Sequence, residues 1–381
     1  MPDLSQDPLG GISLCPSPVH RSILGLVRAA AGCPVGGSLA VDLAASDPEE
    51  LAQIAIYNYV HVVLATGFRQ APELAAAAPR DLKILFSELQ AANLRRNDAI
   101  RAQLGTIGEA LSNAGLRGIV LKGGGELLTP VFPEPAFRFL SDLDILLPPD
   151  NIERAVDSLY EIGAIPDPDN DADYREHHHV AALYRPDWPV PVELHRDLYR
   201  ARRGRGIGLT GSMRETARPS GLPGLDTPAP AHRMAHAVFH AQLQSSRYHL
   251  RELSLRDALE FEMLSRSLPQ ADVAQAAVLF AADAGPASWE ALDAARRLIF
   301  ASPAAAEVLP PAARRWAEKA IIGFGRPGQR SFAASAWTLR RYVGDFLFDP
   351  RRRQYFLGQV TRRGGLQKTL AASRDRNRRI R

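Results

Sequence analysis

Residues 118–128 read Gly118-Ile-Val-Leu-Lys-Gly-Gly-Gly-Glu-Leu-Leu128, and after a proline-rich gap residues 138–147 read Arg138-Phe-Leu-Ser-Asp-Leu-Asp-Ile-Leu-Leu147. An apolar run leads into three glycines and the start of a helix, and a second apolar run follows. We therefore predict strands at 117–122 and 142–147, with a short helix at 126–132 between them. This alternation is typical of a small mixed α/β unit.

The second of these strands carries two aspartates. Residues i and i+2 of a strand point to the same side, so Asp142 and Asp144 would lie next to each other. Two carboxylates in an otherwise apolar strand repel each other and are costly to bury, and a divalent cation makes the arrangement favourable. A solvated strand end is the alternative, but the flanking leucines and Ile145 argue against an exposed strand. We interpret the pair as metal ligands.

A third carboxylate occurs in the later segment Pro189-Val-Pro-Val-Glu-Leu-His195. If this segment is a strand, Glu193 and His195 share one face. A strand placed beside the aspartate strand would bring Asp142, Asp144 and Glu193 together, where they could hold two Mg²⁺ ions, or Mn²⁺ in their place. His195 would then hold the metal ligands in position without itself binding the metal. An ion pair with an arginine is the alternative role for Glu193.

The glycine-rich segment has the features of a phosphate-binding turn. Lys122 and the backbone N–H groups of Gly123, Gly124 and Gly125 lie at a strand–helix junction, where amide donors and the helix dipole favour an anion. Lys122 could equally be a helix-end or ion-pair lysine. Arg138 could contact a phosphate tail or form a structural ion pair with Glu126. A phosphate-binding turn beside a pair of metal-binding aspartates provides the groups that phosphoryl or nucleotidyl transfer requires.

Taken in order, these motifs resemble a bacterial family of uncharacterised nucleotidyltransferases, within the superfamily related to DNA polymerase beta. The resemblance covers roughly residues 50–265. The matching motifs are Leu121-Lys122-Gly123, Arg138, Asp142-Leu143-Asp144 and Glu193-Leu194-His195, followed by His236, His240 and Arg256-Asp257 in a helical segment.

The resemblance implies roles for these residues. Asp142, Asp144 and Glu193 would be the metal ligands, and Gly123 and Gly124 would form the nucleotide phosphate turn. Many members of the wider superfamily have Gly-Ser in this turn, and the serine hydroxyl binds phosphate. This chain has three glycines, so Ser141 or backbone amides would have to replace that hydroxyl.

The pattern of the whole chain predicts an α+β fold, in which a small mixed-sheet core is flanked by N-terminal helices and a C-terminal helical domain. In the N-terminal part, helical patterns occur at 20–31, 48–68 and 80–114, and Gly115 would end the last of them. Two further strands, 178–184 and 190–195, are separated by a Pro-rich turn and predict a hairpin. The predicted regions are a loose N-terminus (1–19), N-terminal helices (20–115), the nucleotidyltransferase core (116–199), a linker or long loop (200–230), C-terminal helices (231–349) and a basic tail (350–381).

The charge of the chain is unevenly distributed. Residues 351–381 contain eleven Lys and Arg and one acid, a net charge of +10, so the remainder carries 35 basic against 41 acidic residues, a net charge of −6. This tail could contact an anionic polymer or a membrane surface, although a solvated chain end is the simpler expectation. No run is apolar enough to span a membrane and no signal peptide is apparent, and two cysteines make no disulfide framework. We expect a cytoplasmic protein.

The histidines suggest an alternative metal site. The run His177–His179 lacks the cysteine or carboxylate spacing of a zinc site, and a polar strand start explains it. His232, His236 and His240 share one helical face without the His-Glu-x-x-His motif of zinc proteases, so we expect them to pack their helix against the sheet. Arg256-Asp257 is most simply a helix-surface or inter-domain ion pair.

The sequence therefore predicts a Mg²⁺-dependent nucleotidyltransferase that moves a nucleoside monophosphate from an NTP to an acceptor hydroxyl. The acceptor stays open among small molecules, peptides, proteins and RNA. A catalytically silent nucleotide-binding or adaptor protein with the same fold is the alternative, and a histidine-based metal hydrolase is the weaker third.

Overall fold

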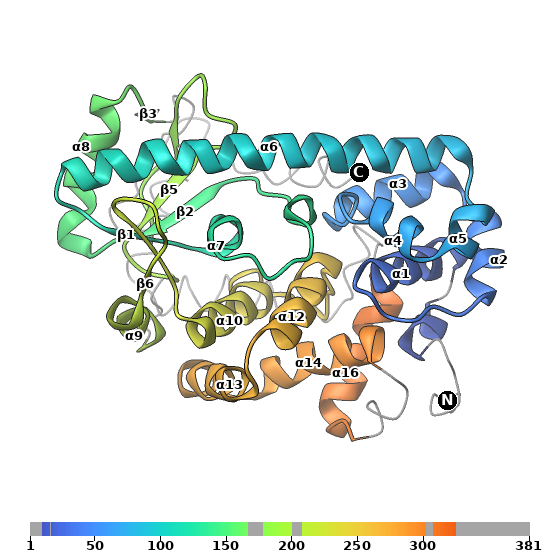
Figure 1. The fold of residues 1–381 in the computed structure, drawn as a ribbon. Coiled ribbons are helices and arrows are strands. Elements are labelled where there is room, and N and C mark those ends of the chain that lie inside the picture. The colour runs from blue at the N-terminus through green and yellow to red at the C-terminus, as the bar shows by residue number, and fades with distance from the viewer. Residues whose placement is uncertain (1–9, 16, 167–177, 200–207, 302–307, 325–381) are drawn as a thin grey trace, which may run out of the picture.

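The computed structural model describes residues 10–15, 17–166, 178–199, 208–301 and 308–324. A seven-stranded sheet lies between a long helix, α6, and a group of C-terminal helices, and a cluster of N-terminal helices packs beside them (Figure 1). This arrangement confirms the predicted α+β class with helices on both flanks of the sheet. The end of the predicted C-terminal helical region, 325–349, and the basic tail at 350–381 lie outside the described residues.

The N-terminal part is helical, as predicted. Its helices are α1 (Pro18–Ala30), α2 (Ser38–Ala44), α3 (Pro48–Tyr57), α4 (Leu64–Gln70), α5 (Pro72–Ala77) and the 34-residue α6 (Arg80–Asn113). The single helix predicted at 48–68 is in fact two helices, because the chain turns at Tyr59 with a left-handed φ of 56°. Helix α6 ends before Gly115, whose φ of +68° suits a glycine.

Part of the segment predicted to be a loose N-terminus, 1–19, is ordered within the described residues. Gly10–Leu14 forms a short 3-10 helix, η1, and Ile12 and Cys15 are buried in the hydrophobic core. The Pro, Gly and Ser content of this segment suggested a loose end, but its few apolar side chains are enough to dock it against α14 (Ala287–Phe300) and α16 (Pro311–Gly323).

The sheet has the strand order β3-β4-β5-β2-β1-β7-β6. Its strands are β1 (Gly118–Val120), β2 (Leu143–Leu146), β3 (Ile165–Pro166), β4 (Leu183–Tyr184), β5 (Val192–His195), β6 (Arg218–Pro219) and β7 (Leu225–Thr227). Strand β2 is antiparallel to β1 and parallel to β5, and β4 and β5 form the predicted hairpin with shorter strands.

Alternate residues of the strands enter two different cores. Val120 and Ile145 pack with Ile100, Leu104 and other side chains of α6 and α8 (Ile152–Glu161). Ile119 and Leu146 belong to the core that the C-terminal helices share. Because Asp144 is two residues before Leu146, its side chain emerges on the face of the sheet turned toward the C-terminal helices.

Helix α7 begins earlier than predicted, at Lys122, and ends at Leu128, so the three glycines form its first turn rather than a loop before it. Close packing explains the glycines. A Cβ on Gly123 would lie 2.8 Å from Leu140 Cγ, and one on Gly124 would lie 2.7 Å from Val120 Cγ1. Glycine therefore lets α7 lie directly against the strands.

The predicted linker at 200–230 is also wrong. From residue 208 onward it contains α9 (Gly208–Thr216), β6 and β7, and β7 pairs with β1 in parallel register, Gly118 opposite Leu225. Leu225 is fully buried. The strands are only two and three residues long and stand among Gly and Pro, so they give no alternating pattern.

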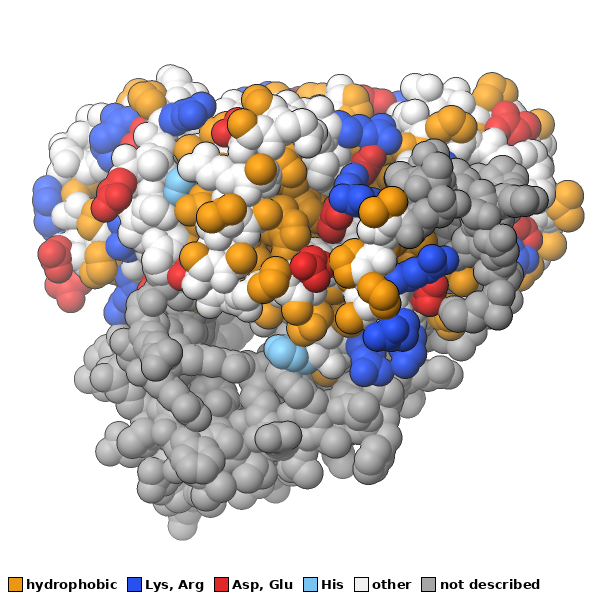
Figure 2. Space-filling model, turned by 90° about the horizontal axis from the view of Figure 1, so that it is seen from below, with side chains coloured by type: hydrophobic (Ala, Val, Ile, Leu, Met, Phe, Trp, Pro, Cys, Tyr) orange, Lys and Arg blue, Asp and Glu red, His pale blue; other side chains and the backbone are white. Residues whose placement is uncertain are grey.

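The C-terminal helices follow the predicted pattern. They are α10 (Pro230–Phe239), α11 (Arg247–Leu250), α12 (Leu255–Ser267), α13 (Gln270–Ala284), α14 and α16. A π-helical turn, His240–Gln244, continues α10. The face of the molecule in Figure 2 mixes hydrophobic side chains with charged ones of both signs over its described part.

Within the described residues, no helix has the length and apolar character that a membrane span requires.

Candidate functional site

Asp144 and Glu193 lie directly opposite each other on neighbouring parallel strands, β2 and β5. The same register places Leu146 opposite His195. Parallel pairing in register puts the side chains of opposed residues on the same side of the sheet. The predicted pairing of the Glu193 strand beside the aspartate strand is therefore confirmed.

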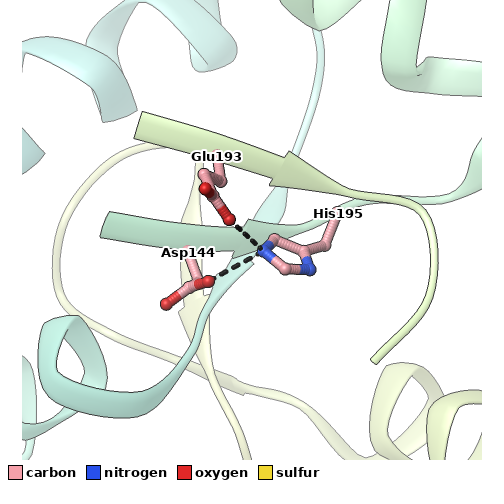
Figure 3. A group of neighbouring side chains, drawn as sticks. All are labelled: Asp144, Glu193 and His195. Atoms are coloured by element: carbon pink, nitrogen blue, oxygen red, sulfur yellow. Dashed lines mark ion pairs between the residues drawn. The ribbon is translucent and has the colours of Figure 1, made fainter. Parts of the chain in front are cut away.

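His195 joins the two carboxylates. Its Nε2 lies 2.8 Å from Asp144 Oδ1 and 3.5 Å from Glu193 Oε2, and Figure 3 shows both carboxylates turned toward this nitrogen. Asp144 and His195 are buried, whereas the Glu193 side chain is 26% exposed. Among the described residues these three form a group whose donor atoms all lie within 4.8 Å of one another. We call Asp144, Glu193 and His195 the triad.

Lys122 also binds the triad. Its Nζ donates a hydrogen bond to Asp144 Oδ1 at 2.9 Å. To do so, Lys122 adopts a left-handed backbone with φ 48°, directly after Leu121 in extended conformation. A left-handed non-glycine residue costs roughly 1–3 kcal/mol, which the surrounding structure has to offset. The ion pair that the sequence left open for this lysine is present.

Each charge in this cluster shifts the pKa of its neighbours. Burial acts to raise the pKa of Asp144, but the charges of Lys122 and His195 outweigh burial and hold it well below its ordinary value. Burial also acts to raise the pKa of Glu193, but the contacts with His195 and His179 outweigh burial and lower it. Burial acts to lower the pKa values of His195 and Lys122, but the carboxylates raise both. In this network the carboxylates and the basic side chains offset the cost of each other's burial.

Asp142 and Ser141 lie at the edge of the site, just before β2 begins. Ser141 is exposed, and its hydroxyl donates to Asp142 Oδ1 at 3.1 Å. Burial and the nearby charge of Asp144 raise the pKa of Asp142. Asp142 therefore interacts electrostatically with Asp144, but it does not belong to the triad.

Two further histidines surround His195, and sequence reasoning did not place them there. The rings of His178 and His179 lie 5.4 Å and 5.1 Å from the His195 ring, and His179 Nε2 is 3.7 Å from Glu193 Oε2. His179 pairs with His195 as an isolated bridge. The predicted hairpin could have indicated this position, because it pairs the segment that begins with the histidine run with the strand that carries Glu193. His177 lies outside the described residues.

The residues predicted to bind phosphate are only partly together. The N–H of Gly125 donates to the carbonyl of Leu121 within the helix, whereas Gly123 and Gly124 occupy the first turn, where amides have no helical acceptor. Arg138 Nη1 lies 3.0 Å from Glu260 Oε2 of α12. The alternative Arg138–Glu126 ion pair is wrong, because Glu126 binds Arg233 of α10.

The histidine face of α10 does turn inward. His232 contacts Thr216 and Ser212 of α9, and the buried His236 ring lies 6.0 Å from that of Tyr199. No group of three metal-binding donors in the described chain includes these histidines. Asp257 is a buried partner of Arg256 and Arg247 rather than a surface residue.

Comparison with known proteins adds one match. A family model described as an uncharacterised nucleotidyltransferase matches residues 44–296, well over half of the chain. No curated protein and no solved structure matches the chain.

Proposed function

The chain belongs to the family of uncharacterised nucleotidyltransferases, and from this premise we propose that it transfers a nucleoside monophosphate from an NTP to an acceptor hydroxyl. In this reaction the acceptor oxygen forms a bond to the α-phosphorus. The bond from that phosphorus to the α,β-bridging oxygen breaks, and pyrophosphate leaves. The acceptor proton passes to a carboxylate of the site. The register of Asp144 against Glu193 is the observation that carries the proposal.

The triad fits a divalent cation, because two carboxylate oxygens and one imidazole nitrogen converge within 4.8 Å. Asp144, Glu193 and His195 would hold the ion, Mg²⁺ or Mn²⁺, and Asp142 would add a carboxylate at the rim. When bound, such an ion neutralises triphosphate charge and lowers the pKa of an attacking hydroxyl.

The remaining residues would hold and orient the substrate. Lys122, which donates to Asp144 Oδ1, would exchange this carboxylate for a phosphate oxygen, since both are anionic acceptors. The amides of Gly123 and Gly124 point from the first turn of α7. The exposed Ser141 hydroxyl can supply the donor that the glycine-rich segment lacks. Glu193, the most exposed triad member, would accept the acceptor proton.

The test is pyrophosphate release from labelled NTPs with Mg²⁺ or Mn²⁺ across candidate acceptors. We expect Asp144→Asn and Glu193→Gln to abolish release. Asp187→Asn, which changes an exposed carboxylate in the β4–β5 turn, should leave it intact. Full activity in Asp144→Asn would contradict the proposal.

A catalytically silent nucleotide-binding protein is the second candidate. It is favoured by Lys122, which already neutralises Asp144, and by the absence of a serine in the glycine segment. Metal-dependent NTP binding without pyrophosphate release for any acceptor would support it, and release would exclude it.

A further inference from the structure

Lys122 also lines a second, narrow pocket between α7, α10 and α12. None of the triad residues is among its lining residues. The lining includes Lys122, Arg138, Arg233, His236, Asp257 and Glu260. Apart from Lys122, every one of these comes from a segment that contributes nothing to the triad, so the pocket is a neighbouring site rather than part of it.

Two buried arginines leave N–H groups unused in this pocket. Arg138 is 6% exposed, and neither its Nε nor its Nη1 has an acceptor in hydrogen-bond geometry among the described residues, although Nη1 lies near Glu260. Arg233 donates to Thr129 and Glu126, but its Nε has no such acceptor either. Buried donors without acceptors are costly, so a ligand that accepts from them binds favourably.

The wall formed by α10 and the π-helical turn after it adds the imidazoles of His236 and His240. Arg233, His236 and Ala237 lie at i, i+3 and i+4, and His240 follows one turn later, so all four share one helix face. The Nε2 of His236 is buried and also has no hydrogen-bond partner among the described residues.

The carboxylates of the pocket do not use up these donors. Asp257 is bound by Arg247 and Arg256 together, and Glu260 Oε2 pairs with Arg138 Nη1, which leaves Arg138 Nε without an acceptor among the described residues. The pocket therefore contains nitrogen donors without acceptors, whereas its two carboxylates are already paired with arginines. Its natural complement is a group with several anionic oxygens.

We propose that this pocket binds a phosphate or carboxylate group of a substrate, held by Arg138 and His236 with Arg233 and Lys122 beside them. We assign to the pocket one small oxyanion group rather than a whole nucleotide. The assignment rests on the proposed function, under which this group belongs either to the NTP triphosphate or to an acidic acceptor.

Calorimetric titration of the full chain with inorganic phosphate, pyrophosphate and succinate tests the pocket without any need for catalysis. We expect at least one probe to bind, and Arg138→Lys to weaken it by about tenfold or more, because lysine lacks the guanidinium fork. The matched control is Arg296→Lys. Arg296 is also paired with a carboxylate of α12, Glu262, but does not line the pocket.

Competition with a non-hydrolysable NTP then separates the two sources. Displacement of the probe, together with weaker NTP binding by Arg138→Lys, assigns the group to the triphosphate. Unchanged NTP binding assigns it to the acceptor. If Arg138→Lys does not fold, the double variant Arg138→Gln/Glu260→Gln removes both charges of the pair and takes its place.

The proposal is overturned if no probe binds at millimolar concentration, or if the pocket variants and His236→Asn bind as the wild type does. A chain that binds phosphate here but transfers no nucleotide would refute the proposed function and leave the pocket standing.

Discussion

Lys122 Nζ donates to Asp144 Oδ1 at 2.9 Å from a backbone that is left-handed at the lysine itself. The lysine thus pairs its ammonium group with Asp144, the buried carboxylate that would bind the metal in the proposed function. Lysine and a divalent cation are alternative partners for the same charge. This competition gives the first prediction.

Lys122→Met should destabilise the protein in the absence of divalent cations, by roughly 3–5 kcal/mol, because it leaves Asp144 buried without its lysine. Mn²⁺ should restore a large part of this loss, and should stabilise the variant more than the wild type. Thermal unfolding with chelator and with Mn²⁺ measures both effects. Lys83→Met is the control, since Lys83 donates to the Ala75 carbonyl and pairs with no carboxylate of the described residues. Equal unfolding temperatures for Lys122→Met and wild type under chelation would contradict this account.

The imidazole of His195 should bias the site toward Mn²⁺. Nitrogen ligands favour transition metals over Mg²⁺, which prefers oxygen. We therefore expect His195→Gln to weaken Mn²⁺ binding by about tenfold or more, and Mg²⁺ binding by much less. Electron paramagnetic resonance of free Mn²⁺, with Mg²⁺ competition, measures the ratio. His232→Gln, outside the triad, should behave as wild type. An unchanged Mn²⁺ to Mg²⁺ ratio in His195→Gln would remove His195 from the ligand set.

Packing of α7 against the sheet gives a stability prediction. A Cβ on Gly124 would lie 2.7 Å from Val120 Cγ1 and 2.9 Å from Leu143 Cδ2, so Gly124→Ala should cost about 1–3 kcal/mol of unfolding free energy. Gly105 in α6 has no atom near its virtual Cβ, so Gly105→Ala should stabilise by about 0.5–1 kcal/mol. Urea denaturation of the two variants compares them directly, and a neutral Gly124→Ala would mean that α7 can shift.

Stability should fall on mild acidification because of His61. Burial lowers the pKa of His61 to about 4, from an ordinary value of 6.5. Between these values the unfolded chain binds a proton that the folded chain does not, so the stability present above pH 6.5 is lost as the pH falls toward 4. His61→Gln should therefore lose roughly 2 kcal/mol less than wild type between about pH 7.5 and about pH 5. Urea denaturation at the two pH values measures this difference. Burial also lowers the pKa of His236, but both proteins contain His236, so its contribution cancels. Parallel losses in both proteins would show that His61 is not the group responsible.

The sequence indicated the parts of the site that depend on local pattern. Strand periodicity put Glu193 and His195 on one face, and the register of Asp144 with Glu193 confirms the hypothesis that their strand lies beside the aspartate strand. The partners of Arg138 and Glu126 could not be predicted in this way, because Glu260 and Arg233 belong to helices far along the chain. The role of the glycines was also hidden, since close packing and phosphate binding both select glycine. Strand β7 could not be predicted, because three residues are too few to show the alternation of apolar and polar side chains that indicates a strand.

The late position of β7 has a consequence for how the protein is made. Strand β1 leaves the ribosome with β2 as one neighbour, but its other neighbour is synthesised about a hundred residues later, at Leu225–Thr227. Until then one edge of β1 is unpaired, and such edges invite association with other chains. A fragment ending at residue 199 would keep that edge permanently. We expect it to aggregate where a fragment extended through α10 stays dispersed.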